Sequence, residues 1–333
     1  MVTTLEDFPT PALVADLGSF RRNLETMSHA LPGARLRPHI KAFKSTAVAG
    51  RLVGAGHQAF CCATIREMEG MARAGFGHDL LLANEVLDAS RLGALSEAGA
   101  RITVAVDSVE TIQAAALGGV PEVLIDVDVG LPRCGCPPES AGRLADTARS
   151  LGLTVRGVMG YEGHLMDLTN RTEQAESVAA CMELLSQAHN QVGGDVISAG
   201  GTGTFDINHV ATEIQAGSYL FMDTHYTKVG LPFEEALTVV ATVISIHSDG
   251  QWAVADAGLK ALAMDHGNPG LDTGAVLFCS DEHTTICDGA WSIGDRVSLR
   301  PAHVDPTISK HETILVVEDG DVVDQWAVDL RHW

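Results

Sequence analysis

Two lysines near the end of a short apolar segment have the plainest chemical potential in this sequence. The segment is Arg35-Leu-Arg-Pro-His-Ile-Lys-Ala-Phe-Lys44, and a helical pattern begins directly after it. Because side chains alternate along a strand, Lys41 shares a face with Arg37 and His39 and projects from the strand's carboxyl end. Lys44 would then belong to the following loop or first helical turn. An amine at a strand end is a position from which a lysine can carry a cofactor; the alternative is an ordinary surface pair.

A glycine-rich stretch, Ser198-Ala-Gly-Gly-Thr-Gly-Thr204, is the second feature with chemical potential, and the run Ala216-Gly-Ser218 follows it. Glycine lets backbone N–H groups approach an anion closely, so the two stretches together predict a phosphate cradle. The spacing matches neither a Walker loop nor a dinucleotide fingerprint, and the other interpretation is a flexible turn. The candidate phosphate-binding residues are Gly200, Gly201, Thr202, Gly217 and Ser218.

The elements that would position these residues alternate between short apolar segments and amphipathic helical patterns, from Pro11 to about Met222. The expected strands are Ala12–Asp16, Leu36–Lys41, Ala59–Ala63, Asp79–Ala83, Ile102–Val106, Val123–Val127, Val155–Tyr161, Val196–Gly200 and Ile214–Phe221. Helices between successive strands require parallel pairing, and about eight such units predict an α/β fold, a (β/α)8 TIM-like barrel. A lysine on the first barrel strand and a phosphate cradle on the last two would face each other, which is the geometry of a pyridoxal phosphate site.

The pattern changes after about Thr227. From Ala236 onward, β-branched and alternating segments are separated by turns such as Ser248-Asp-Gly250, with no clear amphipathic helix. This pattern is typical of an antiparallel β-domain. We therefore expect a barrel domain over residues 1–235, whose N-terminal strand 11–16 is able to pack with the other domain, and a β-domain over residues 236–333.

Composition restricts the classes of partner. The chain has 333 residues, 46% of them apolar, and a formal net charge of -21, so a large core is expected, and nucleic acid and anionic membrane surfaces are excluded as partners. The longest apolar run, Ala236–Ile246, is too short to span a bilayer. The seven cysteines lack a secreted disulfide framework, and the N-terminus carries acid instead of a basic, apolar signal. A cytoplasmic location is expected.

An ordered series of motifs extends over nearly the whole chain. These are Thr10-Pro-Ala-Leu-Val-Ala-Asp16, Arg37-Pro-His-Ile-Lys41, Cys62-Ala-Thr64, Leu82-Ala-Asn-Glu-Val86, Arg133-Cys-Gly135, Gly160-Tyr-Glu-Gly-His164, Gly200-Gly-Thr-Gly-Thr204, Glu213-Ile-Gln-Ala-Gly-Ser-Tyr219, Asp256-Ala-Gly-Leu-Lys260, Asp281-Glu-His283 and His303-Val-Asp-Pro-Thr307. In these motifs the chain closely resembles the D-threonine aldolase and D-serine dehydratase family. That family is similar to alanine racemase: a pyridoxal phosphate-binding barrel followed by a β-domain, usually paired as a homodimer.

The resemblance implies roles for individual residues. Lys41 would be the Schiff-base lysine, and Arg133 would lie near the 3-hydroxyl oxygen of the cofactor, unless it is an ordinary salt-bridged arginine. Tyr161 would reach cofactor or substrate, with a core tyrosine as the alternative. His164 would be the base that acts on the substrate hydroxyl. One departure stands out, because Phe43 occupies a position where the family usually has a histidine.

The resemblance also implies a metal site. His303 and Asp305 are two residues apart, so on a strand both would emerge on one face as a pair of ligands, whereas such a pair in isolation is more often a surface hydrogen bond. Relatives that act as dehydratases tend to have a cysteine at the second position, which favours zinc. A carboxylate there favours Mn²⁺ or Mg²⁺, with Zn²⁺ as the alternative. The nearby Asp281-Glu-His283 would act through a water, through the partner subunit, or only as a solvated turn.

The expected activity is metal-activated cleavage of a small D-3-hydroxy amino acid, such as D-threonine, to glycine and an aldehyde. The alternative on the same fold is a dehydratase of D-serine or D-3-hydroxyaspartate, which releases ammonia. A racemase is a further alternative, although it needs a second base on the opposite face of the cofactor. A non-catalytic pyridoxal phosphate carrier is disfavoured because small carriers of this barrel type lack the β-domain.

Overall fold

The computed structural model describes residues 4–332; residues 1–3 and 333, at the outer ends of the two predicted domains, lie outside the description. The chain divides into two compact units, each formed by several segments. The barrel unit comprises Met27–Lys41, Ala49–Gly217 and Leu330–Trp333. The β-unit comprises Met1–Thr26, Ala42–Val48 and Ser218–Asp329.

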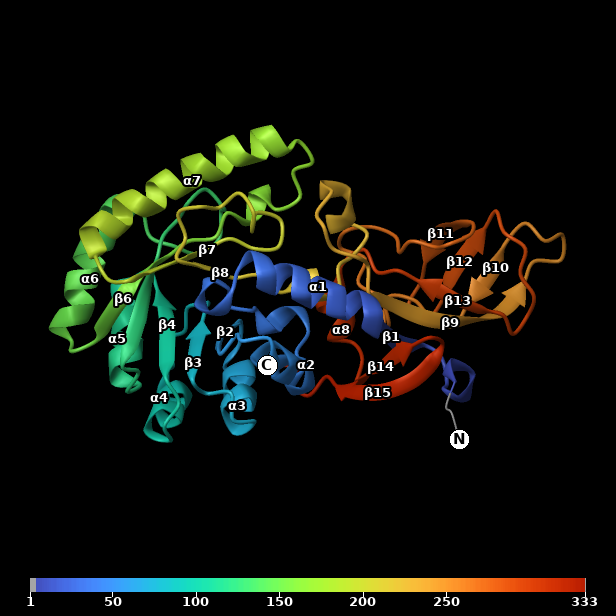
Figure 1. Ribbon diagram of the computed structural model, residues 1–333, viewed down its shortest axis with the longest axis horizontal. Helices are drawn as coiled ribbons and strands as arrows, with labels where there is room; N and C mark the ends of the chain where they lie inside the picture. The colour runs from blue at the N-terminus through green and yellow to red at the C-terminus, as the bar shows by residue number, and fades with distance from the viewer. Residues whose placement is uncertain (1–3, 333) are drawn as a thin grey trace. The chain divides into compact units, whose positions relative to one another are not determined.

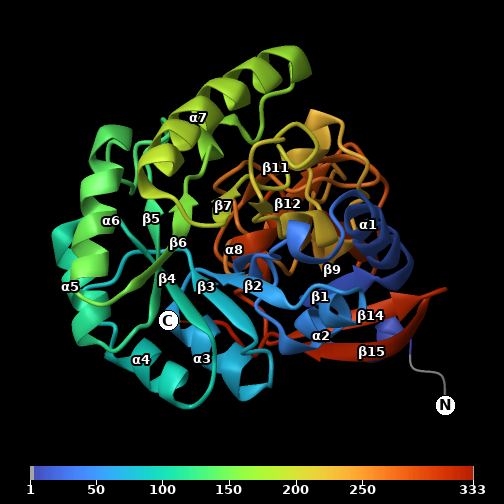
Figure 2. The same ribbon diagram turned by 60° about the vertical axis from the view of Figure 1, so that its left-hand side comes forward.

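The barrel unit contains seven parallel strands, each hydrogen-bonded to the next in chain order. They are β2 (Ala59–Cys62), β3 (Asp79–Leu82), β4 (Ile102–Val106), β5 (Glu122–Asp126), β6 (Thr154–Met159), β7 (Val196–Ala199) and β8 (Glu213–Ile214). Helices lie outside them, as Figure 2 shows for α4, α5 and α6. Buried Cys61, Leu81, Ala105, Leu124 and Met159 pack against one another, one from each of the first five strands. The predicted α/β barrel is confirmed.

Residues 36–39 close the barrel between its last and first strands. Leu36 forms a parallel bridge with Ile214 of β8, and His39 forms one with Cys61 of β2. The amide of His39 donates to the carbonyl of Ala216 at 3.0 Å, and the amide of Cys61 donates to the carbonyl of Pro38 at 2.9 Å. We call residues 36–39 the closing segment, because they act as the eighth parallel member of the barrel.

The predicted strand Leu36–Lys41 is therefore too long. From Ile40 the chain turns into the 3-10 helix η3 (Ile40–Ala42), so Lys41 lies in the turn after the closing segment and not at the end of a strand. Strand alternation ends at His39 for the same reason. The observed strand is also shorter than the predicted strand Ile214–Phe221. Strand β8 stops at Ile214, and the 3-10 helix η6 begins at Ser218.

A buried ion network fills the barrel beneath the closing segment. Arg37, whose side chain is only 2% exposed, donates to Glu213 at 2.7 Å and to Asp79 at 3.1 Å. Arg156 donates to both oxygens of Asp79, at 2.8 and 2.9 Å. Burial alone would raise the pKa of Asp79, but the hydrogen bonds and charges of the two arginines outweigh burial and lower this pKa below its ordinary value. The network thus joins the closing segment to β3, β6 and β8.

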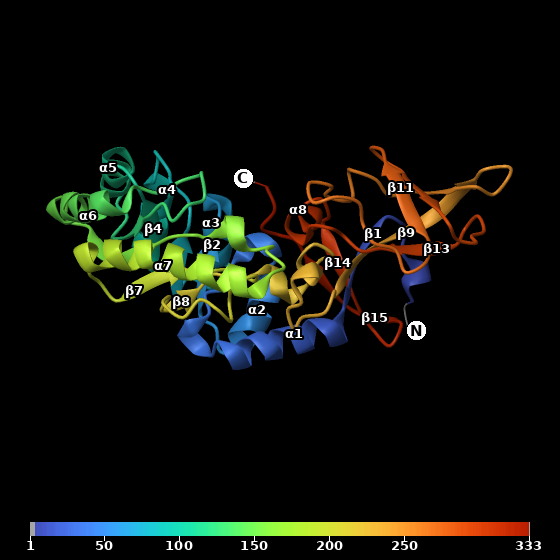
Figure 3. The same cartoon turned by 90° about the horizontal axis from the view of Figure 1, so that it is seen from above.

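The β-unit contains β1 (Ala12–Asp16), β9 (Leu237–Ile246), β10 (Ala253–Ala255), β11 (Ala275–Cys279), β12 (Thr284–Cys287), β13 (Arg296–Leu299), β14 (Thr313–Glu318) and β15 (Asp321–Ala327). Their order is β11-β12-β10-β9-β1-β14-β15, with β13 paired to β9. Figure 3 labels β1, β9, β11, β13, β14 and β15 of this sheet. The expectation of an antiparallel domain is wrong in one respect. The sheet is mixed, because β1 enters from the N-terminal part of the chain and pairs with β14 in parallel.

The α-helices are α1 (Leu17–Ala30), α2 (Thr46–Gly54), α3 (Ile65–Arg73), α4 (Ser90–Glu97), α5 (Val109–Leu117), α6 (Ala141–Ser150), α7 (Arg171–Val192) and α8 (Val304–Ile308), and Figure 1 labels them. Side-chain caps begin several of them just after a strand. At the start of α3, for example, the Thr64 side chain accepts from the backbone amide of Glu67, and the Glu67 carboxylate accepts from the backbone amide of Thr64. Among residues 4–332, no helix has the length and apolar character needed to cross a membrane.

Replacing Arg37 with methionine should lower the free energy of unfolding by about 3–5 kcal/mol, because it leaves the buried Glu213 without its cation, while Asp79 keeps Arg156. Urea denaturation measures the change. Arg91→Met is the matched control, since Arg91 also binds a carboxylate through two hydrogen bonds, to Glu69 at 2.8 and 2.9 Å, but is 52% exposed. A loss for Arg37→Met no larger than that of the control would contradict a structural role for the network.

Candidate active site

Two predicted site residues of the barrel unit lie near the aromatic ring of a third, Tyr161. The Nζ atom of Lys41 is 5.9 Å from the ring centroid of Tyr161, and the Cζ atom of Arg133 is 5.3 Å from the same centroid. Lys41 follows the closing segment, Arg133 follows β5 and Tyr161 follows β6, so all three come from the carboxyl end of the barrel. An amine, a guanidinium and an aromatic ring are thus gathered where barrel enzymes place their chemistry.

His164 lies in the 3-10 helix η5 (Gly163–Leu165), three residues after Tyr161, and its side chain is exposed. Its ring packs close to Gly130. That residue has a φ of +119°, and a Cβ atom there would lie 3.2 Å from Cε1 and 3.3 Å from Nε2 of the imidazole. Glycine at position 130 therefore serves both the backbone conformation and the space that the imidazole occupies.

A buried carboxylate that the sequence analysis missed organises the glycine-rich loop. Glu162 is 0% exposed and accepts three hydrogen bonds: from the amide of Gly200 at 3.1 Å, from the hydroxyl of Thr204 at 2.9 Å and from the side-chain amide of Asn208 at 3.0 Å. Because Glu162 lies between Tyr161 and the turn that carries His164, it ties that segment to the loop. The only signal in the sequence was its place within the motif Gly160-Tyr-Glu-Gly-His164.

The loop is shaped in part by its own packing. The amide of Gly201 donates to the Thr204 hydroxyl at 3.3 Å, so the amides of Gly200 and Gly201 both donate within the protein. A Cβ atom at Gly203 would lie 2.0 Å from the carbonyl oxygen of Met166, which explains a third glycine. Thr202 is 3% exposed, and Gly217 is also buried. Phosphate binding by these residues remains a prediction.

The residues of the barrel unit fit a pyridoxal phosphate group. Lys41 supplies an amine for a carbonyl carbon, and the guanidinium of Arg133 can neutralise a ring oxygen. At Gly200 the φ is +77° and a Cβ atom would lie 2.8 Å from Cδ1 of Ile214, so this turn requires glycine for its own conformation and packing. The Ser218 hydroxyl donates to Asp305 at 2.8 Å within the β-unit, and its part in phosphate binding stays a prediction.

Two acidic residues of the barrel unit, Asp126 and Glu85, interact with each other, and Asp126 also interacts with Arg133. Burial raises the pKa of Asp126 well above its ordinary value, the charge of Glu85 raises it further, and the charge of Arg133 opposes both. Burial and the same two carboxylates raise the pKa of Cys134 to about 12. The Cys134 thiol therefore stays protonated near neutral pH.

The predicted metal ligands are in the β-unit, at the start of a helix. His303 is the N-cap of α8 and Asp305 lies in its first turn, so the expectation that both project from one face of a strand is wrong. Asp223 fixes this turn, because it accepts from the amide of Val304 at 3.1 Å and from the amide of Tyr226 at 2.8 Å. Burial raises the pKa of Asp223 to about 6.

The structure brings His303 together with two residues that the sequence analysis did not select. The Nδ1 atom of His303 is 2.6 Å from Oδ2 of Asp265, and the ring of His266 stacks on that of His303 with centroids 4.1 Å apart. Possible ligand atoms of Asp265, His266 and His303 lie within 4.8 Å of one another, and Asp305 is not in this group of described residues. Imidazole nitrogens and carboxylate oxygens are donors that suit a divalent ion.

The segment Asp281-Glu-His283 forms an exposed turn between β11 and β12. The carboxylate of Glu282 accepts from Lys260 at 2.6 Å, and the amide of Ser280 donates to the carbonyl of His283 at 2.8 Å. These contacts match the solvated turn that was one of the three interpretations of this segment.

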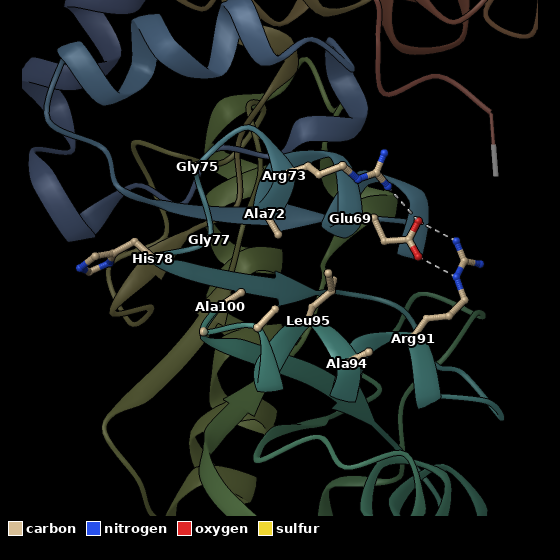
Figure 4. A pocket seen from close by; sticks show the side chains of 12 residues that line it. Glu69, Ala72, Arg73, Gly75, Gly77, His78, Arg91, Ala94, Leu95 and Ala100 are labelled. Carbon is tan, nitrogen blue, oxygen red and sulfur yellow. Dashed lines mark hydrogen bonds and ion pairs between the residues drawn. The ribbon is translucent and has the colours of Figure 1, made fainter.

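A pocket of about 660 Å³ in the barrel unit is separate from these residues (Figure 4). It is lined by α3, α4 and the loops that lead into β3 and β4, and the carboxylate of Glu69 bonds to Arg91 and Arg73 at its side. These loops precede the strands, so the pocket opens at the amino end of the barrel. Barrel enzymes build their sites at the other end.

Comparison with known proteins assigns both parts of the chain. A family model of the alanine racemase N-terminal domain matches residues 15–225, and a model of a serine dehydratase domain matches residues 236–317. The chain is 34% identical over 357 residues to a D-threonine aldolase of an Arthrobacter species, covering 97% of this chain and 92% of that protein. It belongs to the alanine racemase-like family of D-threonine aldolases and 3-hydroxyaspartate dehydratases.

Other relatives of this chain include both aldolases and a dehydratase. A 3-hydroxy-D-aspartate aldolase of Paracoccus denitrificans is 32% identical, over 98% of this chain and 92% of its own. The crystal structure of a D-threonine aldolase from Filomicrobium marinum superposes with a TM-score of 0.92 at 31% identity, covering 99% of this chain and 98% of that one. A cysteine-to-alanine variant of a D-threo-3-hydroxyaspartate dehydratase, in its metal-free form, gives a TM-score of 0.91 at 26% identity, covering 99% of this chain and 100% of that one. Family membership implies pyridoxal phosphate as the cofactor.

Replacing Glu162 with alanine should weaken pyridoxal phosphate binding and lower the melting temperature. Each buried donor left without a partner costs about 1–3 kcal/mol, and 1.4 kcal/mol corresponds to a tenfold change in affinity. Absorbance titration of the apoenzyme measures the dissociation constant. Glu176→Ala, at an exposed position of α7, is the control. Unchanged cofactor affinity in Glu162→Ala would show that the carboxylate does not organise a cofactor loop.

Proposed function

We propose that this protein is a metal-activated, pyridoxal phosphate-dependent aldolase. It would cleave D-threonine and related D-3-hydroxy amino acids to glycine and an aldehyde. The observation that carries the choice is the pair His303 and Asp305, an imidazole and a carboxylate at the start of α8, in a chain 34% identical to a D-threonine aldolase. An oxygen donor beside a nitrogen donor suits Mn²⁺ or Mg²⁺, with Zn²⁺ as the alternative.

The barrel unit would hold the cofactor. Lys41 would bind it covalently, and Arg133, which also lies near the Tyr161 ring, would neutralise its ring oxygen. The phosphate would be held at the glycine-rich loop that Glu162 shapes, by Gly200, Gly201, Thr202, Gly217 and Ser218. When bound, pyridoxal phosphate withdraws the electrons released at the substrate Cα.

The hydroxyl group of the substrate would be the second group on which the protein acts. A divalent ion, when bound by His303 and Asp305, supplies positive charge that lowers the pKa of a hydroxyl group. His164 would accept the hydroxyl proton as a general base. The Cα–Cβ bond then breaks, the oxygen becomes the carbonyl of the aldehyde, and Cα takes up a proton to give glycine.

A second candidate function is dehydration of D-3-hydroxyaspartate or D-serine. It is favoured by the superposition with the D-threo-3-hydroxyaspartate dehydratase variant at a TM-score of 0.91. In that reaction a base would remove the α-proton and the hydroxyl group would leave. Racemase activity has less support, because a solved alanine racemase is only 15% identical and shares the fold alone.

We further propose that the protein acts as a homodimer on small molecules in the cytoplasm. The family resemblance supports the dimer. Seven free cysteines, three of them partly exposed, suit a reducing compartment.

Chelation with EDTA should abolish turnover of D-threonine while the cofactor absorbance persists, because Lys41 and every proposed cofactor residue except Ser218 belong to the barrel unit, whereas the proposed metal ligands belong to the β-unit. His303→Ala and Asp305→Ala should reproduce this separation, with kcat/KM reduced at least about a hundredfold, or about 2.7 kcal/mol of lost transition-state stabilisation. The wild-type products should be glycine and acetaldehyde in equal amounts. Full activity after chelation would remove the metal from the mechanism, and stoichiometric 2-oxobutanoate and ammonia would identify a dehydratase.

A further inference from the structure

A row of three imidazoles lies beside one carboxylate in the β-unit. The ring of His225 is 4.3 Å from that of His266, and the ring of His266 is 4.1 Å from that of His303, nearly parallel at 5°. Asp265 contacts His303 from the edge of its ring, through Nδ1 at 2.6 Å. The Nε2 atom of His303 has no hydrogen-bond partner among the residues that the structure describes.

The stacked geometry separates ligands from supports. An ion bound by a histidine nitrogen lies in the plane of its ring, about 2.0–2.1 Å from the nitrogen. Two rings 4.1 Å apart and 5° from parallel have planes that do not meet within that distance, so His266 and His303 cannot bind the same ion in this arrangement. Proximity of ligand atoms therefore does not make His266 a ligand.

The contact between Asp265 and the edge of the His303 ring determines which nitrogen of His303 can bind a metal ion. A neutral imidazole donates from one nitrogen and accepts through the other, and the ionised carboxylate of Asp265 can only accept. The 2.6 Å contact between Oδ2 of Asp265 and Nδ1 of His303 makes the carboxylate the acceptor of the Nδ1 proton. The proton of His303 is thus held on Nδ1, and the lone pair is left on Nε2.

We propose that Asp265 and His266 are positioning residues for the metal ligand His303. Asp265 fixes the tautomer and raises the basicity of Nε2, and His266 fixes the tilt of the ring by covering one face. A carboxylate that orients a metal-binding histidine in this way is a common source of metal affinity. The inference rests on the proposed function, since it takes His303 as a metal ligand.

Mn²⁺ binding to the cofactor-loaded protein tests the proposal by equilibrium dialysis, without reference to activity. Asp265→Ala should raise the dissociation constant about 10- to 100-fold, and Asp265→Asn should recover most of the affinity because its amide oxygen still accepts from Nδ1. His266→Phe keeps a flat ring and removes both nitrogens, so it should bind Mn²⁺ as the wild type does.

The chain offers a matched control for the removal of a carboxylate from a histidine. Asp249 bonds to Nδ1 of His247, whose ring stacks on Trp252 with centroids 3.6 Å apart. Asp249→Ala removes the same kind of contact and should leave Mn²⁺ affinity unchanged. Thermal unfolding and cofactor absorbance establish that each variant is folded; if Asp265→Ala is not folded, the asparagine and phenylalanine variants decide.

The outcomes distinguish this proposal from the proposed function. Wild-type affinity in Asp265→Ala, with Mn²⁺ binding lost in His303→Ala, would overturn the positioning role and leave the metal assignment intact. A loss in His266→Phe as large as in His303→Ala would make His266 a ligand and also overturn the proposal. Wild-type Mn²⁺ binding in His303→Ala would remove the metal site itself, and with it the proposed function.

Discussion

The hydrogen bonds that hold residues 36–39 between β8 and β2 are the constraint on which the barrel site depends. They complete the ring of parallel members, and the buried Arg37 anchors them to Glu213 and Asp79. The next turn presents Lys41 at the carboxyl end of the barrel, near Tyr161. A loss of the Arg37 contacts would therefore affect both the closure of the barrel and the place of the lysine.

Carboxylates also support several of the other candidate residues; Glu162 and Asp223 are buried, and Asp265 is exposed. Glu162 joins the loop at Gly200 to the segment that carries Tyr161 and His164. In the β-unit, Asp223 fixes the turn before Asp305, and Asp265 bonds to His303. Groups that would touch cofactor, substrate or metal are held by acceptors that touch none of them, which limits the motion of the reacting groups.

Much of this arrangement could be predicted from the sequence, and the exceptions have physical reasons. The alternation of apolar segments and helices predicted the barrel, because period and order are local properties. The segment Leu36–Lys41 was predicted too long, because the chain leaves the barrel wall after His39 and enters η3, a turn that no local apolar pattern marks. Neither Glu162 nor Asp265 was found, because a carboxylate that supports another residue has no spacing of its own. The parallel pairing of β1 with β14 joins the two ends of the chain, which no local pattern reports.

The assignment of the cofactor to Lys41 is the central claim, because every other role in the barrel unit is defined relative to it. Borohydride reduction of the holoenzyme, followed by peptide mapping, fixes pyridoxal phosphate to whichever lysine carries it. The label should appear on Lys41, should disappear in Lys41→Ala and should persist in Lys44→Ala. Lys44 lies in the turn after Lys41, with a φ of 46°. A label on Lys44 in the wild-type protein would contradict the account.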